Sequence, residues 1–224
     1  MPRQAFFLLP HTWAVTRYRE FHRERFFTDA EMARLGDALT AMENEFAIVR
    51  GVATAVRLLA LTGCRMSEIL GLKWAQVDLD AGSFRLEDAK AGARTVVLNA
   101  AAIELLALLP RDTEWVVTGA KADKPLSAST LQHSFERVLK RAEIPNARLH
   151  DLRHTVGTYA AQTGANAFLV RDILGHANVG MTQRYVGRAT DPQRAVSDRI
   201  GERIATAMSG KSAEVVPLGK KSAS

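Results

Sequence analysis

The chain has 224 residues, 47% of them hydrophobic and 24% charged, a composition typical of a folded globular protein rather than a disordered or collagen-like one. No apolar run approaches the roughly 18 residues that span a bilayer, and the single cysteine, Cys64, excludes an internal disulfide and a cysteine zinc cage. The net charge of +6 is weak support for a nucleic-acid partner, because +3 of it lies in residues 1–26 and +2 in residues 211–224. We therefore expect a cytoplasmic protein with no membrane segment.

The N-terminal segment, residues 1–26, is rich in aromatic side chains but too short to form a core of its own. We expect these rings to pack on the main body, on a partner or on another domain. Thr28, followed three residues later by Glu31, predicts the start of a helix with a capping box, and Phe27 is suited to a hydrophobic staple. This helix is expected to run to about Met42.

In the rest of the chain, helical spacing of apolar residues is interrupted by one stretch with the pattern of strands. Apolar residues recur with helical spacing over 45–61, Thr62 and Gly63 end that helix, and a short helix follows over 64–72. The pattern then predicts strands at 83–87, 94–98 and 115–117. The remaining expected helices are 127–142, 151–163, 166–174, 178–187 and 191–208. The fold class is therefore mostly α with a small antiparallel three-stranded sheet over 27–208, and residues 209–224 are expected to be a flexible tail.

The first chemically suggestive motif is Thr62-Gly63-Cys64-Arg65-Met66-Ser67-Glu68. An arginine at a helix start adds its charge to the free N–H groups there, which favours binding of an anion. Burial of such a charge requires an anion or a carboxylate partner, and Glu68, one turn later, is suited to be that partner. The simpler alternative is an exposed or Glu-paired arginine without a function.

In the second motif, Arg153 lies three positions and His154 four positions after His150, so each of them pairs with His150 on a helix surface. The His-x-x-x-His spacing also occurs in zinc metalloproteases. Here the position after the first histidine is Asp151, whose side chain is too short to reach a metal-bound water well, and Arg153 would repel the ion. We therefore expect no metal site. The alternative to a functional role is a helix with two partly buried histidines.

Two further positions complete the set. Lys90 lies at the tip of the expected hairpin, and Tyr185 follows His176 of the Leu174-Gly175-His176 motif by nine residues. Taken alone, Lys90 is an ordinary solvated turn residue and Tyr185 an ordinary surface aromatic. The chain has no Gly-x-x-x-x-Gly-Lys loop and no Gly-x-Ser-x-Gly elbow, which disfavours nucleotide hydrolysis and serine esterase chemistry.

In their order and spacing these motifs resemble the catalytic domain of the tyrosine recombinase, or phage integrase, family. The resemblance runs from about Arg25 to about Met208 and includes Thr-Gly-x-Arg-x-Ser-Glu, a lysine 25 residues after the arginine, His-x-Leu-Arg-His-Thr and Leu-Gly-His. It implies six active-site residues: Arg65, Lys90, His150, Arg153, His176 and Tyr185.

The resemblance also implies the reaction, which is site-specific recombination of double-stranded DNA. Tyr185 would attack a phosphodiester to leave a 3′-phosphotyrosyl link and a free 5′-hydroxyl, and a 5′-hydroxyl of another strand would reverse the attack, with no metal and no other cofactor. The charge that builds on the phosphate suits the guanidinium groups of Arg65 and Arg153, which can donate to its non-bridging oxygens.

The proton transfers would fall to the remaining three residues. A tyrosine with a reference pKa near 10 is about one part in a thousand ionised at neutral pH, so it needs a base, for which His150 is the expected residue. Lys90 would protonate the departing 5′-oxygen, and His176 would hydrogen-bond the phosphate.

The expected helix 191–208 carries a narrow apolar stripe of Val196, Ile200, Ile204 and Met208. In the family a C-terminal helix often docks on a neighbouring protomer, which implies self-association into a tetramer on DNA; the alternative is that it packs on its own domain. Family members usually also carry an N-terminal domain that clamps DNA, and residues 1–26 are too few to form it. The chain is thus expected to be either a fragment or a naturally short protein.

Two other functions stay open at this point. A type IB topoisomerase shares this chemistry but rejoins the same strand. A DNA-binding relic would bind without cutting, although the complete set of six residues disfavours that alternative.

Overall fold

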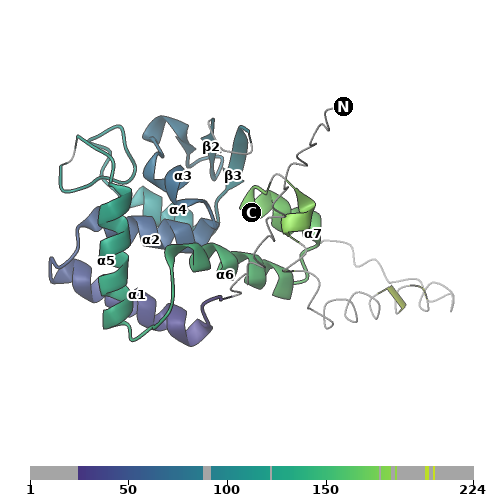
Figure 1. The fold of residues 1–224 in the computed structure, drawn as a ribbon. Helices are drawn as coiled ribbons and strands as arrows, with labels where there is room; N and C mark the ends of the chain where they lie inside the picture. The colour runs from purple at the N-terminus through teal and green to yellow at the C-terminus, as the bar shows by residue number, and fades with distance from the viewer. Residues whose placement is uncertain are drawn as a thin grey trace, which may run out of the picture.

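The computed structural model describes residues 25–87, 92–121, 123–176, 178–182, 185, 200–201 and 204. Helices make up most of this part of the chain (Figure 1). The helices are α1 (Asp29–Asn44), α2 (Arg50–Thr62), α3 (Met66–Leu70), α4 (Ala100–Ala107), α5 (Ala128–Arg141), α6 (Leu149–Gln162) and α7 (Ala167–Leu174), with the 3₁₀ turns η1 (Trp74–Gln76) and η2 (Val179–Met181). The strands are β1 (Val77–Asp78), β2 (Ser83–Leu86) and β3 (Arg94–Val97).

The start of α1 is as the sequence predicts. The Glu31 backbone N–H donates to Thr28 Oγ1 at 3.3 Å, and the Glu31 carboxylate accepts from the Thr28 backbone N–H at 3.0 Å. Two orphan donors of the first turn are thereby satisfied. Phe27 is completely buried, and its backbone N–H donates to Thr155 Oγ1 in α6 at 2.8 Å. The beginning of the described chain is therefore tied to the helix that carries much of the candidate site.

The helix predicted over 45–61 begins only at Arg50, so the prediction for its first five residues is wrong. Phe46 takes a left-handed φ of 55° and is 94% exposed. The backbone N–H groups of Ala47 and Ile48 both donate to the carbonyl of Met42, which reverses the chain after α1. The apolar character of this segment thus reflects partial burial of a tight turn and not one face of a helix.

Helix α2 forms the centre of the core. It packs against α1, α3, α4, α5 and α6, with the sheet and α3 on one side of it and α1 on the other (Figure 1). Its small and branched side chains, such as Val52, Ala55 and Val56, are fully buried, which allows several helices to approach one another closely. Gly63, with a φ of 64°, ends the helix and leads the chain into α3.

The sheet has three antiparallel strands in the order β1-β2-β3. The predicted strands 83–87 and 94–98 correspond to β2 and β3, which pair with Phe84 opposite Val96. The prediction of a third strand at 115–117 is wrong, because β1 occupies that place and Trp115 forms only an isolated bridge with Lys73. Val116 and Val117 are buried core residues, so burial rather than sheet pairing explains their apolar character.

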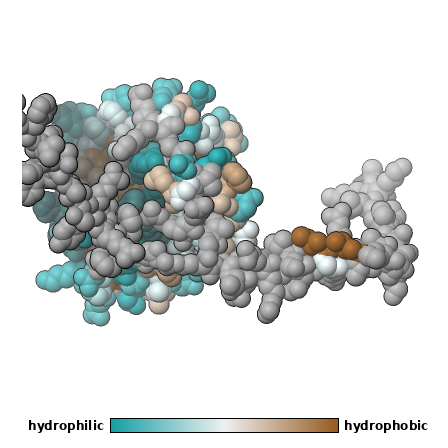
Figure 2. All heavy atoms as spheres, turned by 45° about the vertical axis from the view of Figure 1, so that its right-hand side comes forward, coloured by the Kyte–Doolittle hydropathy of each residue, from teal (hydrophilic) through white to brown (hydrophobic). Residues whose placement is uncertain are grey.

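The later helices largely follow the prediction. Ser127 caps α5 and Asn166 caps α7, each by accepting from a backbone N–H of the first turn. Where a helix is expected over 178–187, the described residues contain the short turn η2, and most of 191–208, like Lys90 and the tail 209–224, lies outside the described residues. The described residues contain no helix long and apolar enough to cross a membrane. The face seen in Figure 2 is mostly hydrophilic over the described part.

Candidate functional site

The N-terminus of α3 holds Arg65 in the position that the motif suggests. Arg65 is the N-cap residue, and its Nη1 donates to Glu68 Oε1 at 2.9 Å. The other carboxylate oxygen, Oε2, accepts from the Arg65 backbone N–H at 2.7 Å. Glu68 is 8% exposed. The expectation that Glu68 partners Arg65 is confirmed. The ion pair holds the Arg65 guanidinium at the N-terminus of α3.

A second arginine, Arg94 at the start of β3, shares the same carboxylate. Its Nη2 donates to Glu68 Oε2 at 2.9 Å. Burial acts to raise the pKa of Glu68, but the backbone hydrogen bond and the charge of Arg94 outweigh it and hold the pKa below its ordinary value. Sequence analysis missed Arg94. The sequence pattern that could have identified Arg94 is the alternation of side chains along β3. Arg94 lies on the same face as the buried Val96 and Leu98, and a charged group on that face needs a partner.

Helix α6 brings Arg153 to this group, although Arg153 lies 59 to 88 positions later in the sequence. Arg153 is 4% exposed, and its Nη1 donates to the Gly63 carbonyl at 2.6 Å. Burial, followed by the charges of Arg65 and, more weakly, Arg94, lowers its pKa to about 10, so it stays protonated at neutral pH. The cluster thus contains three guanidinium groups and one carboxylate, and the resulting positive charge can bind an anion.

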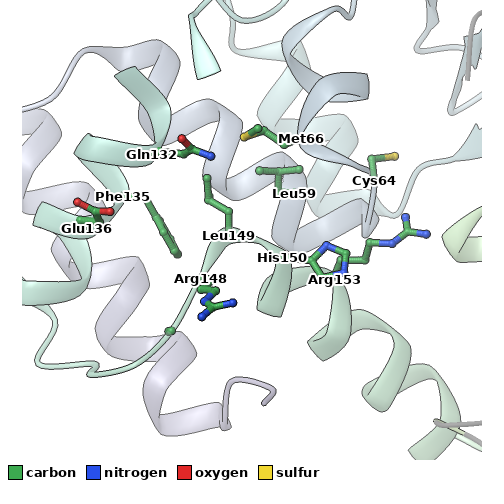
Figure 3. Close-up of a pocket in the computed structure, with 11 residues that line it drawn as sticks. Leu59, Cys64, Met66, Gln132, Phe135, Glu136, Arg148, Leu149, His150 and Arg153 are labelled. Carbon is green, nitrogen blue, oxygen red and sulfur yellow. The ribbon is translucent and has the colours of Figure 1, made fainter. Parts of the chain in front are cut away.

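A pocket of about 560 Å³ opens beside this cluster. His150, in the first turn of α6, and Arg153 lie at one end of it, next to Cys64 (Figure 3). The remaining lining residues are Leu59, Met66, Gln132, Phe135, Glu136, Ala147, Arg148 and Leu149. Burial raises the pKa of the Cys64 thiol, which disfavours its thiolate form. Cys64 is 1% exposed and acts here as a small buried apolar residue.

The C-terminal end of α7 reaches the cluster through Gly175. Its carbonyl accepts from Arg65 Nη2 at 3.0 Å, and its φ of 62° ends the helix. A Cβ at Gly175 would lie 2.4 Å from Arg94 Nε, so only glycine fits here without displacing that guanidinium. The next residue, His176, pairs its Nδ1 with Thr182 Oγ1 at 3.0 Å. Arg65, Arg94 and His176 therefore meet around one turn of the backbone.

Tyr185 lies beside both His176 and α6. Its ring stacks on His176 with a centroid distance of 6.4 Å, and its hydroxyl is 2.7 Å from Nδ1 of His154. His154 in turn makes an edge contact with His150, at a centroid distance of 4.7 Å. Sequence analysis did not include His154 among the site residues. Its spacing of four from His150 is the signal that both share one face of the helix.

The other described tyrosine, Tyr159, is directed away from this site. Its hydroxyl donates toward the carboxylate of Asp29 and the carbonyl of Phe27, at the start of α1. Burial and the neighbouring Asp29 raise its pKa to about 12. Tyr185 is thus the described tyrosine at the arginine cluster.

The structure brings together five of the six residues predicted from the sequence, and Lys90 lies outside the described residues. Within the described ranges, no three His, Cys, Asp or Glu side chains gather in a way that could hold a metal ion. The arrangement combines a positive cluster, several imidazoles and a half-buried phenol. Such a set can bind a phosphate group and present a hydroxyl near it.

A family model and curated relatives both indicate the same family. The model of the phage integrase family matches residues 25–191. The prophage integrase IntF of Escherichia coli is 30% identical over 141 residues, which are 59% of this chain and 30% of the relative. The tyrosine recombinase XerA of Saccharolobus solfataricus is 28% identical over 165 residues, which are 72% of this chain and 52% of the relative. The chain therefore spans about half or less of the length of these curated relatives.

Solved structures agree with the observed architecture. The crystal structure of XerA recombinase has a TM-score of 0.61 at 23% identity, covering 78% of this chain and 64% of that one. The Tn1549 transposon integrase, solved in complex with transposon right end DNA, has a TM-score of 0.64 at 21% identity, covering 81% and 67%. These likenesses establish the fold. Because the family model matches well over half of the sequence, the protein belongs to the phage integrase family.

Proposed function

We propose that this protein is a site-specific DNA recombinase in which Tyr185 attacks a DNA phosphodiester and forms a 3′-phosphotyrosyl intermediate. The observation that carries the proposal is the convergence of Tyr185 with the arginine cluster: its ring stacks on His176, which follows the residue that accepts a hydrogen bond from Arg65. Relatives named tyrosine recombinases and an integrase solved with DNA support it.

The arginine cluster supplies the phosphate-binding half of the reaction. As the fifth oxygen approaches phosphorus, negative charge grows on the non-bridging oxygens, and fixed guanidinium donors stabilise that charge without reorganisation. Glu68 holds Arg65 through its side chain, and the Gly63 carbonyl holds Arg153. These contacts pre-orient the donors before DNA arrives. His176 is the proposed further donor to the phosphate.

The proton transfers need a base at the phenol and an acid at the leaving oxygen. Lys90 remains the proposed acid, on the strength of the sequence motif alone. The role of base, which the sequence motif favours for His150, has better support for His154, whose Nδ1 is 2.7 Å from the Tyr185 hydroxyl. His150 borders the pocket beside Arg153, a position suited to contact with the DNA phosphate.

The proposed domain organisation is a catalytic domain over 27–208, preceded by a segment and followed by a tail. The buried Phe27 and its hydrogen bond to Thr155 support the first boundary. Double-stranded DNA is the proposed partner, with self-association into a tetramer through the helix 191–208. Ile200 and Ile204, the described members of its apolar stripe, are 54% and 52% exposed, which fits a surface that another protomer covers.

The test uses a pool of nicked duplexes with randomised sequence, so that the target site need not be known. In a nicked substrate the short strand beyond the cleavage site diffuses away after cleavage. Its 5′-hydroxyl is then no longer present to reverse the reaction, so the covalent complex accumulates. We expect the protein to yield adducts that survive denaturing electrophoresis, and Tyr185→Phe to yield none. Tyr159→Phe is the matched control and should form adducts as the original chain does. Adducts from Tyr185→Phe would overturn the proposal.

A further inference from the structure

Two residues of α6, His154 and Gly157, contact Tyr185, and His150 continues the same helix face. His150, His154 and Gly157 are spaced by four and three positions, so they lie along the same face of the helix. His154 meets the phenol hydroxyl, and Gly157 meets the ring. We call His154 and Gly157 the tyrosine seat.

Gly157 has a steric reason to be glycine. It lies in the interior of α6, where glycine weakens a helix relative to alanine. A Cβ built there would be 2.8 Å from both Cε1 and Cζ of Tyr185 and 3.1 Å from a methyl of Leu174. Contacts below 3.0 Å force one of the groups to move. The missing side chain therefore lets the phenol ring lie directly on the helix backbone.

His154 has an electronic reason to be histidine. In a neutral imidazole one ring nitrogen accepts and the other carries the proton. The distance of 2.7 Å between Nδ1 and the phenol oxygen is that of an O–H···N hydrogen bond. With the phenol as donor, Nδ1 is the acceptor, and the imidazole is already aligned along the path of the departing proton.

We propose that the tyrosine seat positions the nucleophile and that His154 is its general base. This inference rests on the proposed function. As the Tyr185 oxygen forms its bond to phosphorus, the bond from phosphorus to the 5′-oxygen breaks. The phenolic proton passes to His154 Nδ1, and the 5′-oxygen takes a proton from the acid assigned to Lys90. On rejoining, the incoming 5′-hydroxyl gives up its proton to that acid, and His154 returns its proton to the tyrosine.

The experiment separates proton acceptance from mere orientation by the choice of substitution. In His154→Asn the amide oxygen takes approximately the place of Nδ1, so it can keep the hydrogen bond to the phenol, but it cannot take up the proton. We expect adduct formation to slow by roughly 10²–10⁴-fold, the usual contribution of a general base. Non-covalent DNA binding should be unchanged. His133→Asn is the matched control, because His133 is exposed on α5 and bonds the Ser129 carbonyl of its own helix.

A more acidic phenol tests the role of base directly. When a fluorinated tyrosine replaces Tyr185, a larger fraction of the phenol is ionised and needs no base. We expect this replacement to restore most of the rate lost in His154→Asn, whereas it would not repair a misplaced ring. Failure of the rescue, or a rate for His154→Asn equal to that of the original chain, would overturn the inference. Either result leaves the proposed function standing as long as Tyr185→Phe forms no adduct.

Discussion

The two halves of the candidate site are held in different ways. The proposed phosphate-binding half consists of Arg65, Arg94 and Arg153, whose guanidinium groups are anchored by the buried Glu68 and by backbone carbonyls. The proposed nucleophile half is Tyr185, which is half-buried and follows α7 by eleven residues. Its described anchors are side-chain contacts with His154 and His176, the space above Gly157, and a backbone hydrogen bond from its N–H to the Thr182 carbonyl at 3.0 Å.

This difference indicates which half is built into the core and which half is docked onto it. Displacing Arg153 requires breaking a buried hydrogen bond of the domain interior, whereas displacing Tyr185 requires breaking contacts with one face of α6 and with the neighbouring His176. Buried polar groups that lose their partners carry a large penalty. Changes in the first half should therefore affect stability and cleavage together, and changes in the second half should affect cleavage alone.

Among these substitutions, Arg153→Ala is expected to have the largest effect on cleavage. Cleavage should fall by about 10²–10³-fold, because one pre-oriented donor to the phosphate is lost. The Gly63 carbonyl also loses its partner, which should lower the free energy of unfolding by about 1–3 kcal/mol. Single-turnover adduct formation and urea denaturation measure the two effects. DNA binding should be mostly retained. Arg153→Lys, which keeps the charge but not the fork, should recover only part of the rate.

Gly157→Ala tests how the position of Tyr185 affects cleavage. The new methyl group would push the Tyr185 ring off α6, and a misplacement of about 1 Å can cost roughly 100-fold in rate. We therefore expect adduct formation to fall by about 10–100-fold with unfolding by urea nearly unchanged. Gly36→Ala is the matched control, since no atom lies within 4 Å of a Cβ at that position of α1. Equal cleavage by the Gly157→Ala and Gly36→Ala variants would contradict the proposal that the tyrosine seat positions Tyr185.

The smallest effect is expected for Tyr159→Phe, which touches neither half. It should leave cleavage unchanged and lower the free energy of unfolding by about 0.5–1.5 kcal/mol through the lost hydrogen bonds. Because the pKa of Tyr159 is raised to about 12 in the folded chain, its contribution is complete below pH 10 and is lost as the pH rises toward 12. Urea denaturation across this range should show a steeper loss of stability for the original chain than for the variant. A parallel loss in both chains would argue against the assignment.

Predictions from the sequence succeeded where structure depends on near neighbours. The capping box of Thr28 and Glu31, the hairpin of β2 and β3 and the pairing of Glu68 with Arg65 all join residues within a short stretch. The errors at Phe46 and at 115–117 have the opposite origin. At 115–117 the apolar residues Val116 and Val117 are buried without pairing in the sheet, and the turn after α1 combines the exposed Phe46 with the buried Ile48. Apolar character alone does not distinguish a helix, a strand and a packed turn.

The sequence by itself determined the family and predicted five described candidate site residues, because the order and spacing of short motifs are local properties that do not depend on coordinates. Tertiary structure decided which imidazole meets the phenol and that a third guanidinium joins the cluster. His150 and His154 share one helix face, so their spacing cannot rank them. The choice depends on where the segment after α7 folds back onto α6, and on a strand that brings Arg94 to a carboxylate 26 residues earlier. Both are contacts between distant parts of the chain, which no local pattern encodes.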